Sequence, residues 1–98
     1  SGVLEQITDP GDIPVRHYLR LEVPDRPGVL ARVAGALAAE EVGIAALDQP
    51  EILDTVAEQV PIRIMTHPVA TTRLDAALSL LDEDLRSITG PIRIRIEE

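Results

Sequence analysis

The chain has 98 residues, which is enough for one small domain with one core. Its formal net charge of −8 argues against binding to nucleic acid or to an anionic membrane surface, since both attract clustered lysine and arginine. It contains no cysteine, which excludes disulfides, thiolate nucleophiles and thiolate metal sites, and no apolar run approaches the length of a membrane-spanning helix.

The first fourteen residues are predicted to lie outside the domain. Ser1-Gly2 is typical of a cloning scar, and the stretch that follows it to Pro14 has the proline, glycine and polar residues of a linker. We therefore expect a scar and linker at 1–14 and one domain at 15–98, cut from a longer protein. Since neither a signal peptide nor a membrane helix is seen, we expect a cytoplasmic location.

A strand and then a helix are predicted at the start of the domain. Polar and apolar residues alternate from Arg16 to Val23, as in a half-buried strand. The apolar residues that should point to the core are Leu19, Leu21 and Val23. Helical spacing follows, with Pro27 suited to the first helical position and Gly43 to the C-terminal cap.

The junction between this strand and this helix has the features of a small ligand site. The helix would leave the amides of Gly28, Val29 and Leu30 unpaired, and they favour a carboxylate together with the positive end of the helix dipole. Asp25 stands beside them as a partner for an ammonium group, so the combination indicates a free amino acid. The candidate ligand-binding residues are Asp25, Arg26, Gly28, Val29 and Leu30. The alternative is a turn in which proline and glycine serve only geometry.

Four further elements are predicted after Gly43. A second strand should start at Ile44, but Pro50 has no N–H for a ladder and confines this segment to a sheet edge or ends it. After a turn near Asp54, the remaining elements are a strand from Val60 to Thr66, a helix capped by Thr71 or Thr72 that carries apolar residues to Leu85, and a last strand with Ile92, Ile94 and Ile96. This order predicts an α+β, ferredoxin-like βαββαβ fold, with a four-stranded antiparallel sheet and two helices on one face.

Three segments carry a resemblance to a known family. They are Asp25-Arg26-Pro27-Gly28-Val29-Leu30, Ile64-Met65-Thr66-His67-Pro68-Val69 and Ile92-Arg93-Ile94-Arg95-Ile96-Glu97-Glu98. Over roughly Val15 to Glu98, the chain resembles the C-terminal ACT domain of homoserine dehydrogenase, an enzyme of aspartate-family amino-acid biosynthesis. The resemblance implies a regulatory domain that binds a small amino acid, with threonine as the first candidate. It also implies a homodimer and an NAD(P)-dependent catalytic domain elsewhere in the parent enzyme.

No catalytic machinery is predicted within the chain itself. It has no G-x-G-x-x-G fingerprint, no nucleophile elbow and no P-loop, so we expect neither an enzyme nor a cofactor site here. His17 and His67 should lie at neighbouring strand ends, because the first and third strands of this topology are antiparallel neighbours. No cysteine or convergent carboxylate completes a zinc site around them, so we expect no metal.

A second function stays open beside amino-acid binding. In ACT domains the second strand of a neighbouring domain usually supplies the other wall of the ligand site. The stretch from Ala45 to Pro50 departs from that pattern because it is short and ends in proline. This departure favours the alternative, a ligand-free dimerisation module that joins two chains through a strand edge or through the open face of the sheet.

Overall fold

A computed structural model describes residues 12–50, 58–85 and 89–96, with side chains described up to Leu81. The elements follow the predicted order: β1 (Arg16–Pro24), α2 (Val29–Ala39), β2 (Ile44–Asp48), β3 (Gln59–Thr66), α3 (Thr71–Leu85) and β4 (Thr89–Ile96). The predicted turn near Asp54 lies outside the described residues, as does the predicted linker before residue 12.

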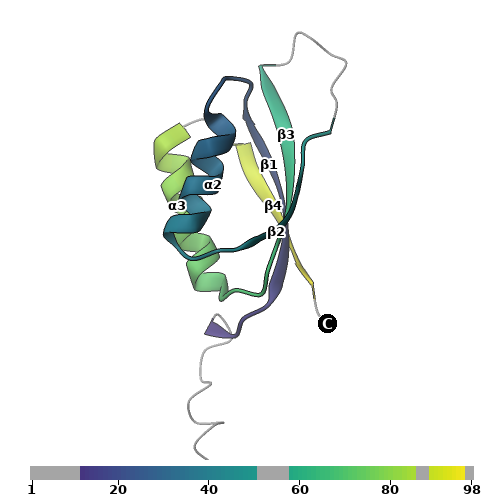
Figure 1. Cartoon of the computed structure of the whole chain (residues 1–98), viewed down its shortest axis with the longest axis vertical. Helices are drawn as coiled ribbons and strands as arrows, with labels where there is room; N and C mark the ends of the chain where they lie inside the picture. The colour runs from purple at the N-terminus through teal and green to yellow at the C-terminus, as the bar shows by residue number, and fades with distance from the viewer. Residues whose placement is uncertain (1–11, 51–57, 86–88, 97–98) are drawn as a thin grey trace, which may run out of the picture.

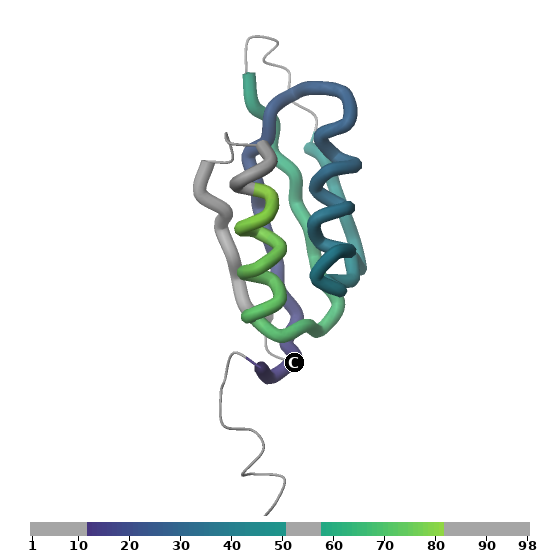
Figure 2. Tube along the Cα trace, turned by 90° about the vertical axis from the view of Figure 1, so that its left-hand side faces the viewer, coloured from purple at the N-terminus to yellow at the C-terminus, as the bar shows by residue number. Residues whose placement is uncertain are grey.

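The strands form one antiparallel sheet in the order β2-β3-β1-β4. The register sets Tyr18 of β1 opposite Met65 of β3 on one side and opposite Ile94 of β4 on the other. Both helices cover the same face of the sheet (Figure 1) and lie side by side across it (Figure 2). This arrangement confirms the predicted α+β, ferredoxin-like fold. It also confirms that β2 lies at an edge of the sheet and ends before Pro50.

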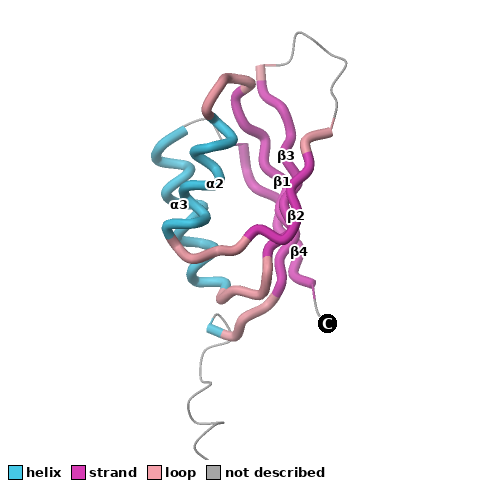
Figure 3. The backbone as a smooth tube through the Cα atoms, in the orientation of Figure 1, coloured by secondary structure: helices cyan, strands magenta, loops and turns pink. Residues whose placement is uncertain are grey.

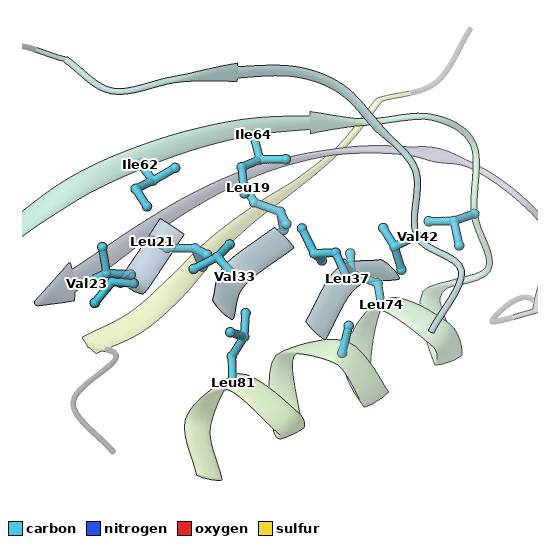
Figure 4. Packing of buried hydrophobic residues seen from close by; sticks show 13 residues of the cluster. Leu19, Leu21, Val23, Val33, Leu37, Val42, Ile62, Ile64, Leu74 and Leu81 are labelled. Atoms are coloured by element: carbon cyan, nitrogen blue, oxygen red, sulfur yellow. The ribbon is translucent and has the colours of Figure 1, made fainter. Parts of the chain in front are cut away.

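The core is aliphatic and lies between the sheet and the two helices (Figure 4). The buried positions of β1 confirm the predicted inward face: Leu19 and Leu21 are fully buried and Val23 nearly so. The helices contribute the buried residues Val33 and Leu37 from α2 and Leu74, Ala77 and Leu81 from α3. Burying one large aliphatic side chain stabilises the fold by about 1.5–3 kcal/mol, so these contacts hold the two layers together.

The C-terminal end of α2 differs from the prediction. The helix ends at Ala39, and Glu41 adopts a left-handed conformation with a φ of 58°. The N–H of Val42 donates to the carbonyl of Leu37 at 2.8 Å, and that of Glu41 donates to the carbonyl of Ala38 at 3.0 Å. These are the two hydrogen bonds of a Schellman motif, with a glutamate in the position that usually holds glycine.

The prediction that Gly43 caps α2 is therefore wrong, and Gly43 has a different role. A Cβ atom at this position would lie 3.1 Å from Cδ2 of His67. The N–H of His67 also donates to the carbonyl of Gly43 at 2.9 Å. The missing side chain at Gly43 thus lets the imidazole lie against the backbone that leads into β2.

The start of α3 also differs from the prediction. The carbonyl of Ala70 accepts a hydrogen bond from the N–H of Leu74 at 3.2 Å, so the capping position is Ala70. The prediction that Thr71 or Thr72 caps this helix is wrong, because both residues already lie inside it. The hydroxyl of Thr72 instead donates to a carboxylate oxygen of Asp12, over a distance of 3.5 Å.

Replacing Glu41 with glycine is expected to stabilise the domain by about 0.5–1 kcal/mol, because glycine adopts a positive φ without the steric penalty of a Cβ atom. The measurement is the urea midpoint at unchanged m-value. Glu41→Gln is the control, since it keeps the strained backbone and removes only the exposed ion pair between Glu41 and Arg73, whose charged atoms lie 3.2 Å apart. A lower midpoint for the glycine variant would contradict the assignment of strain to this residue.

Candidate functional site

The turn from β1 into α2 is built by Pro27 and Gly28. Gly28 has φ 86° and ψ −12°, and the N–H of Val29 donates to the carbonyl of Arg26 at 3.4 Å. Proline followed by glycine at positive φ, closed by this hydrogen bond, is a type II turn. The helix begins after the turn, at Val29, with Gly28 as its N-cap. The prediction that Pro27 is the first helical residue is therefore wrong.

The three amides that were predicted to be unpaired behave differently from one another. The N–H of Val29 closes the type II turn, so the prediction is wrong for this group. No backbone carbonyl within the described ranges accepts a hydrogen bond from the N–H of Gly28 or of Leu30. The first helical hydrogen bond runs from the N–H of Arg32 to the carbonyl of Gly28 at 3.1 Å. Two of the three predicted amides thus stay available for a ligand carboxylate.

All five predicted ligand residues line one pocket of about 230 Å³. Its walls consist of the predicted residues Asp25, Arg26, Gly28, Val29 and Leu30, together with Val23, Pro24, Pro27, Gln49, Val60 and Ile62. The N–H of Asp25 donates to the carbonyl of Glu58 at 3.2 Å, which ties the loop to the start of β3. The volume is below the roughly 300–1,000 Å³ that is usual for larger ligands, so the pocket suits a solute of few heavy atoms.

The walls that come from β3 and from the end of β2 were not among the predicted site residues. Gln49 is the most informative of these residues, because its carboxamide can both donate and accept a hydrogen bond. The signal that could have found it is topological. Since β3 runs antiparallel to both β1 and β2, the ends of β1 and β2 meet the start of β3 at one end of the sheet. Figure 3 shows the turn after β1 at that same end.

A second hollow of about 240 Å³ adjoins the turn. It is lined by Arg26, Pro27, Val29 and Arg32, of which the first three also line the first pocket. Its lining offers two guanidinium groups but no carboxylate for an ammonium group. The first pocket offers both signs of charge, and we take it as the candidate site.

The two histidines occupy different environments. His17 is buried, and its backbone N–H donates to the hydroxyl oxygen of Thr66 at 3.0 Å. His67 is exposed, and its ring lies against Gly43. Within 12–50, 58–85 and 89–96, no three histidine, aspartate or glutamate residues are grouped so that they could hold a metal ion. No helix in these ranges has the length and apolar character needed to cross a membrane.

Comparisons with known proteins agree on the family. The ACT domain model matches residues 17–86. The homoserine dehydrogenase of Pseudomonas aeruginosa is 38% identical over 87 residues, which cover 84% of this chain and 19% of the enzyme. A crystal structure of a homoserine dehydrogenase from Thiobacillus denitrificans matches with a TM-score of 0.73 and 32% identity, over 90% of this chain and 19% of that one. The chain thus spans about a fifth of the length of these relatives.

A further similarity concerns the fold alone. The ligand-free regulatory subunit of aspartate kinase from Thermus thermophilus matches with a TM-score of 0.61 and 21% identity. The match covers 82% of this chain and 50% of that subunit. The same arrangement of strands and helices therefore occurs in a protein whose sequence has little identity with this one.

Replacing Gly28 with alanine is expected to destabilise the domain by about 1 kcal/mol, because the left-handed conformation is unfavourable for any residue with a Cβ atom. No atom lies within 4 Å of the Cβ that would be added, so the backbone conformation alone causes the loss. Gly35→Ala in α2 is the matched control. Its added Cβ also meets no atom within 4 Å, but alanine should stabilise the helix by about 0.5–1 kcal/mol. Urea unfolding of both variants tests whether the free energy of unfolding falls for Gly28→Ala and rises for Gly35→Ala. An unchanged free energy for Gly28→Ala would contradict the prediction.

Proposed function

This chain belongs to the ACT domain family, and on that premise we propose that it is the regulatory part of a homoserine dehydrogenase and binds a small amino acid. The observation that carries the proposal is the pocket in which Asp25, the amides at the start of α2 and Gln49 converge. The NAD(P)-dependent oxidation or reduction of homoserine belongs, in this proposal, to a catalytic domain of the parent enzyme. The cytoplasmic location expected from the sequence stays a prediction.

The charged ends of an amino acid fit opposite parts of the pocket. Its carboxylate accepts hydrogen bonds from the amides of Gly28 and Leu30, where the helix dipole and the guanidinium group of Arg26 add positive charge. Its ammonium group pairs with the carboxylate of Asp25. This orientation turns the side chain of the ligand toward the walls made by β3 and Gln49.

The walls made by β3 and Gln49 favour a short side chain of mixed character. The half-buried Val60 supplies apolar surface for a methyl group, and the carboxamide of Gln49 supplies a hydrogen-bond partner for a hydroxyl group. Threonine carries both groups on one carbon atom, so we take it as the first candidate ligand. Such a ligand regulates the parent enzyme only if it has different affinities for two arrangements of the subunits.

Titrating the ¹⁵N-labelled domain with threonine, and then with other amino acids, is expected to give saturable ¹⁵N–¹H shifts at Gly28, Val29 and Leu30. Asp25→Ala should weaken binding about tenfold, because it removes a charge-assisted hydrogen bond, while leaving the fold intact. Asp75→Ala is the control, since it removes a carboxylate on α3 that does not line the pocket. An unchanged affinity for the Asp25 variant would remove Asp25 from the site, and the absence of shifts with every amino acid would contradict ligand binding by the domain.

A second candidate function is ligand-free association of two chains, and the exposure of β2 favours it. The strand lies at the sheet edge, and each of its residues after Ile44 is exposed. An edge strand presents backbone N–H and C=O groups with which another chain can pair. A homodimer formed along this edge would also bring a second chain close to Gln49, so the two candidate functions are compatible.

Sedimentation at several protein concentrations, with and without threonine, is expected to separate the two functions. Ligand binding at a site completed by a second chain predicts that threonine strengthens association, because a ligand stabilises the state that binds it. A dimerisation module without a ligand predicts the same dissociation constant in both samples. A monomer at all concentrations would contradict the homodimer in either form.

A further inference from the structure

The segment Thr66-His67-Pro68-Val69, which the candidate site does not use, interrupts the pairing between β1 and the chain after β3. The ladder pairs Tyr18 with Met65, and pairing resumes where Val15 and Val69 exchange hydrogen bonds of 3.1 and 2.9 Å. Between these pairs, residues 16–17 face residues 66–68, so the second side is longer by one residue, as in a β-bulge. The hydroxyl oxygen of Thr66 accepts the N–H of His17 at 3.0 Å within this interval.

The bulged segment contacts the start of β2. Thr66 is fully buried and lies opposite Ile44 in the β2–β3 register. The next residue, His67, donates its N–H to the carbonyl of Gly43 at 2.9 Å. The imidazole also fills the space beside Gly43, because a Cβ there would lie 3.1 Å from Cδ2 and 3.6 Å from Cβ of His67. The backbone N–H and the ring of His67 therefore both contact Gly43, the residue just before β2.

Apart from its pairing with β3 and the packing of Ile44 against the core, few described contacts fix the position of β2. The strand has five residues, pairs only with β3, and shifts register between Ile44 and Ala46. Leu47 is 36% exposed, so it buries only part of its surface. At the far end, Asp48 forms an exposed ion pair with Arg63, and such pairs contribute little to stability. The chain then continues into Gln49 and the pocket wall.

We propose that His67 is a positioning residue for the amino-acid pocket, because the contact of its ring and N–H with Gly43 sets the place of β2 and thereby of Gln49. The proposal rests on the proposed function in one respect, that Gln49 contacts the ligand. His67 itself does not line the pocket. Five extended residues span about 16 Å, so a shift at the Gly43 end reaches the pocket through a short, stiff strand.

The test compares His67→Ala with His67→Phe in the whole chain. The alanine variant loses the ring beside Gly43, and hydrogen exchange of the β2 amides (Ile44–Asp48) should become about tenfold faster than in the unchanged protein. The ¹⁵N–¹H resonances of the Gln49 carboxamide should shift without any ligand. The phenylalanine variant keeps a planar ring and should restore both readouts. Exchange of the β1 amides serves as the internal control, since general destabilisation would accelerate it as well.

Gly43→Ala supplies an independent perturbation from the other side of the same contact. The added Cβ would displace the ring of His67, so this variant should also shift the Gln49 resonances. The His67→Ala background lacks the tight contact with Cδ2 and keeps the Cβ of residue 67 at 3.6 Å, an ordinary contact, so the second substitution should then have little further effect. This non-additivity is the signature of direct coupling between the two residues.

Two results would overturn the proposal. The first is unchanged β2 exchange and unchanged Gln49 resonances in His67→Ala. The second is exchange that accelerates equally in β1 and β2, which marks a general loss of stability. Both readouts are made without ligand, so they do not depend on amino-acid binding. Failure of the proposed function would appear separately, as the absence of threonine binding by the unchanged protein. If threonine does bind, its affinity should fall in His67→Ala and recover in His67→Phe.

Discussion

The pairing of β1 along both of its edges is the constraint on which the rest of the structure depends. The strand is hydrogen-bonded to β3 and to β4, and its inner residues are buried beneath the helices. A strand that is hydrogen-bonded along both edges and packed on one face cannot shift easily, so the positions of both of its ends are well determined. One end meets the bulged segment at Val15, and the other places Asp25 at the mouth of the pocket.

The strands β1 and β3 and both helices could be predicted from the sequence because each has one buried face, which imposes a period of two or of 3.6 residues. The ends of α2 could not be predicted in the same way. Its start depends on positive φ at Gly28, one residue after Pro27, which the sequence pattern places at the first helical position. Its end depends on positive φ at Glu41, a residue type that is rarely expected there. Leu37 and Val42, which lie on either side of this helix end, are both buried in the core.

The candidate site was predictable in the part that is contiguous in sequence. The residues from Asp25 to Leu30 could be recognised because turn chemistry and the start of a helix are local properties. Gln49 and Ile62 reach the same pocket only because strand pairing brings them there, and no local pattern identifies them. The contact between His67 and Gly43 could not be predicted for the same reason, because it joins residues that are far apart in the sequence. The local sequence around Gly43 indicates only a helix cap.

The place of Tyr18 decides what optical spectroscopy reports about this domain. The chain has one tyrosine and neither tryptophan nor phenylalanine, so all of its aromatic absorption and emission arises from this residue. Tyr18 is half-buried and alternates with the inward-facing Leu19, which puts it on the sheet face away from the helices, opposite Met65. Near-ultraviolet dichroism and intrinsic fluorescence therefore monitor the uncovered face of the sheet and anything that docks on it. Loosening of the aliphatic core beneath the helices passes unseen by both methods until the sheet itself unfolds.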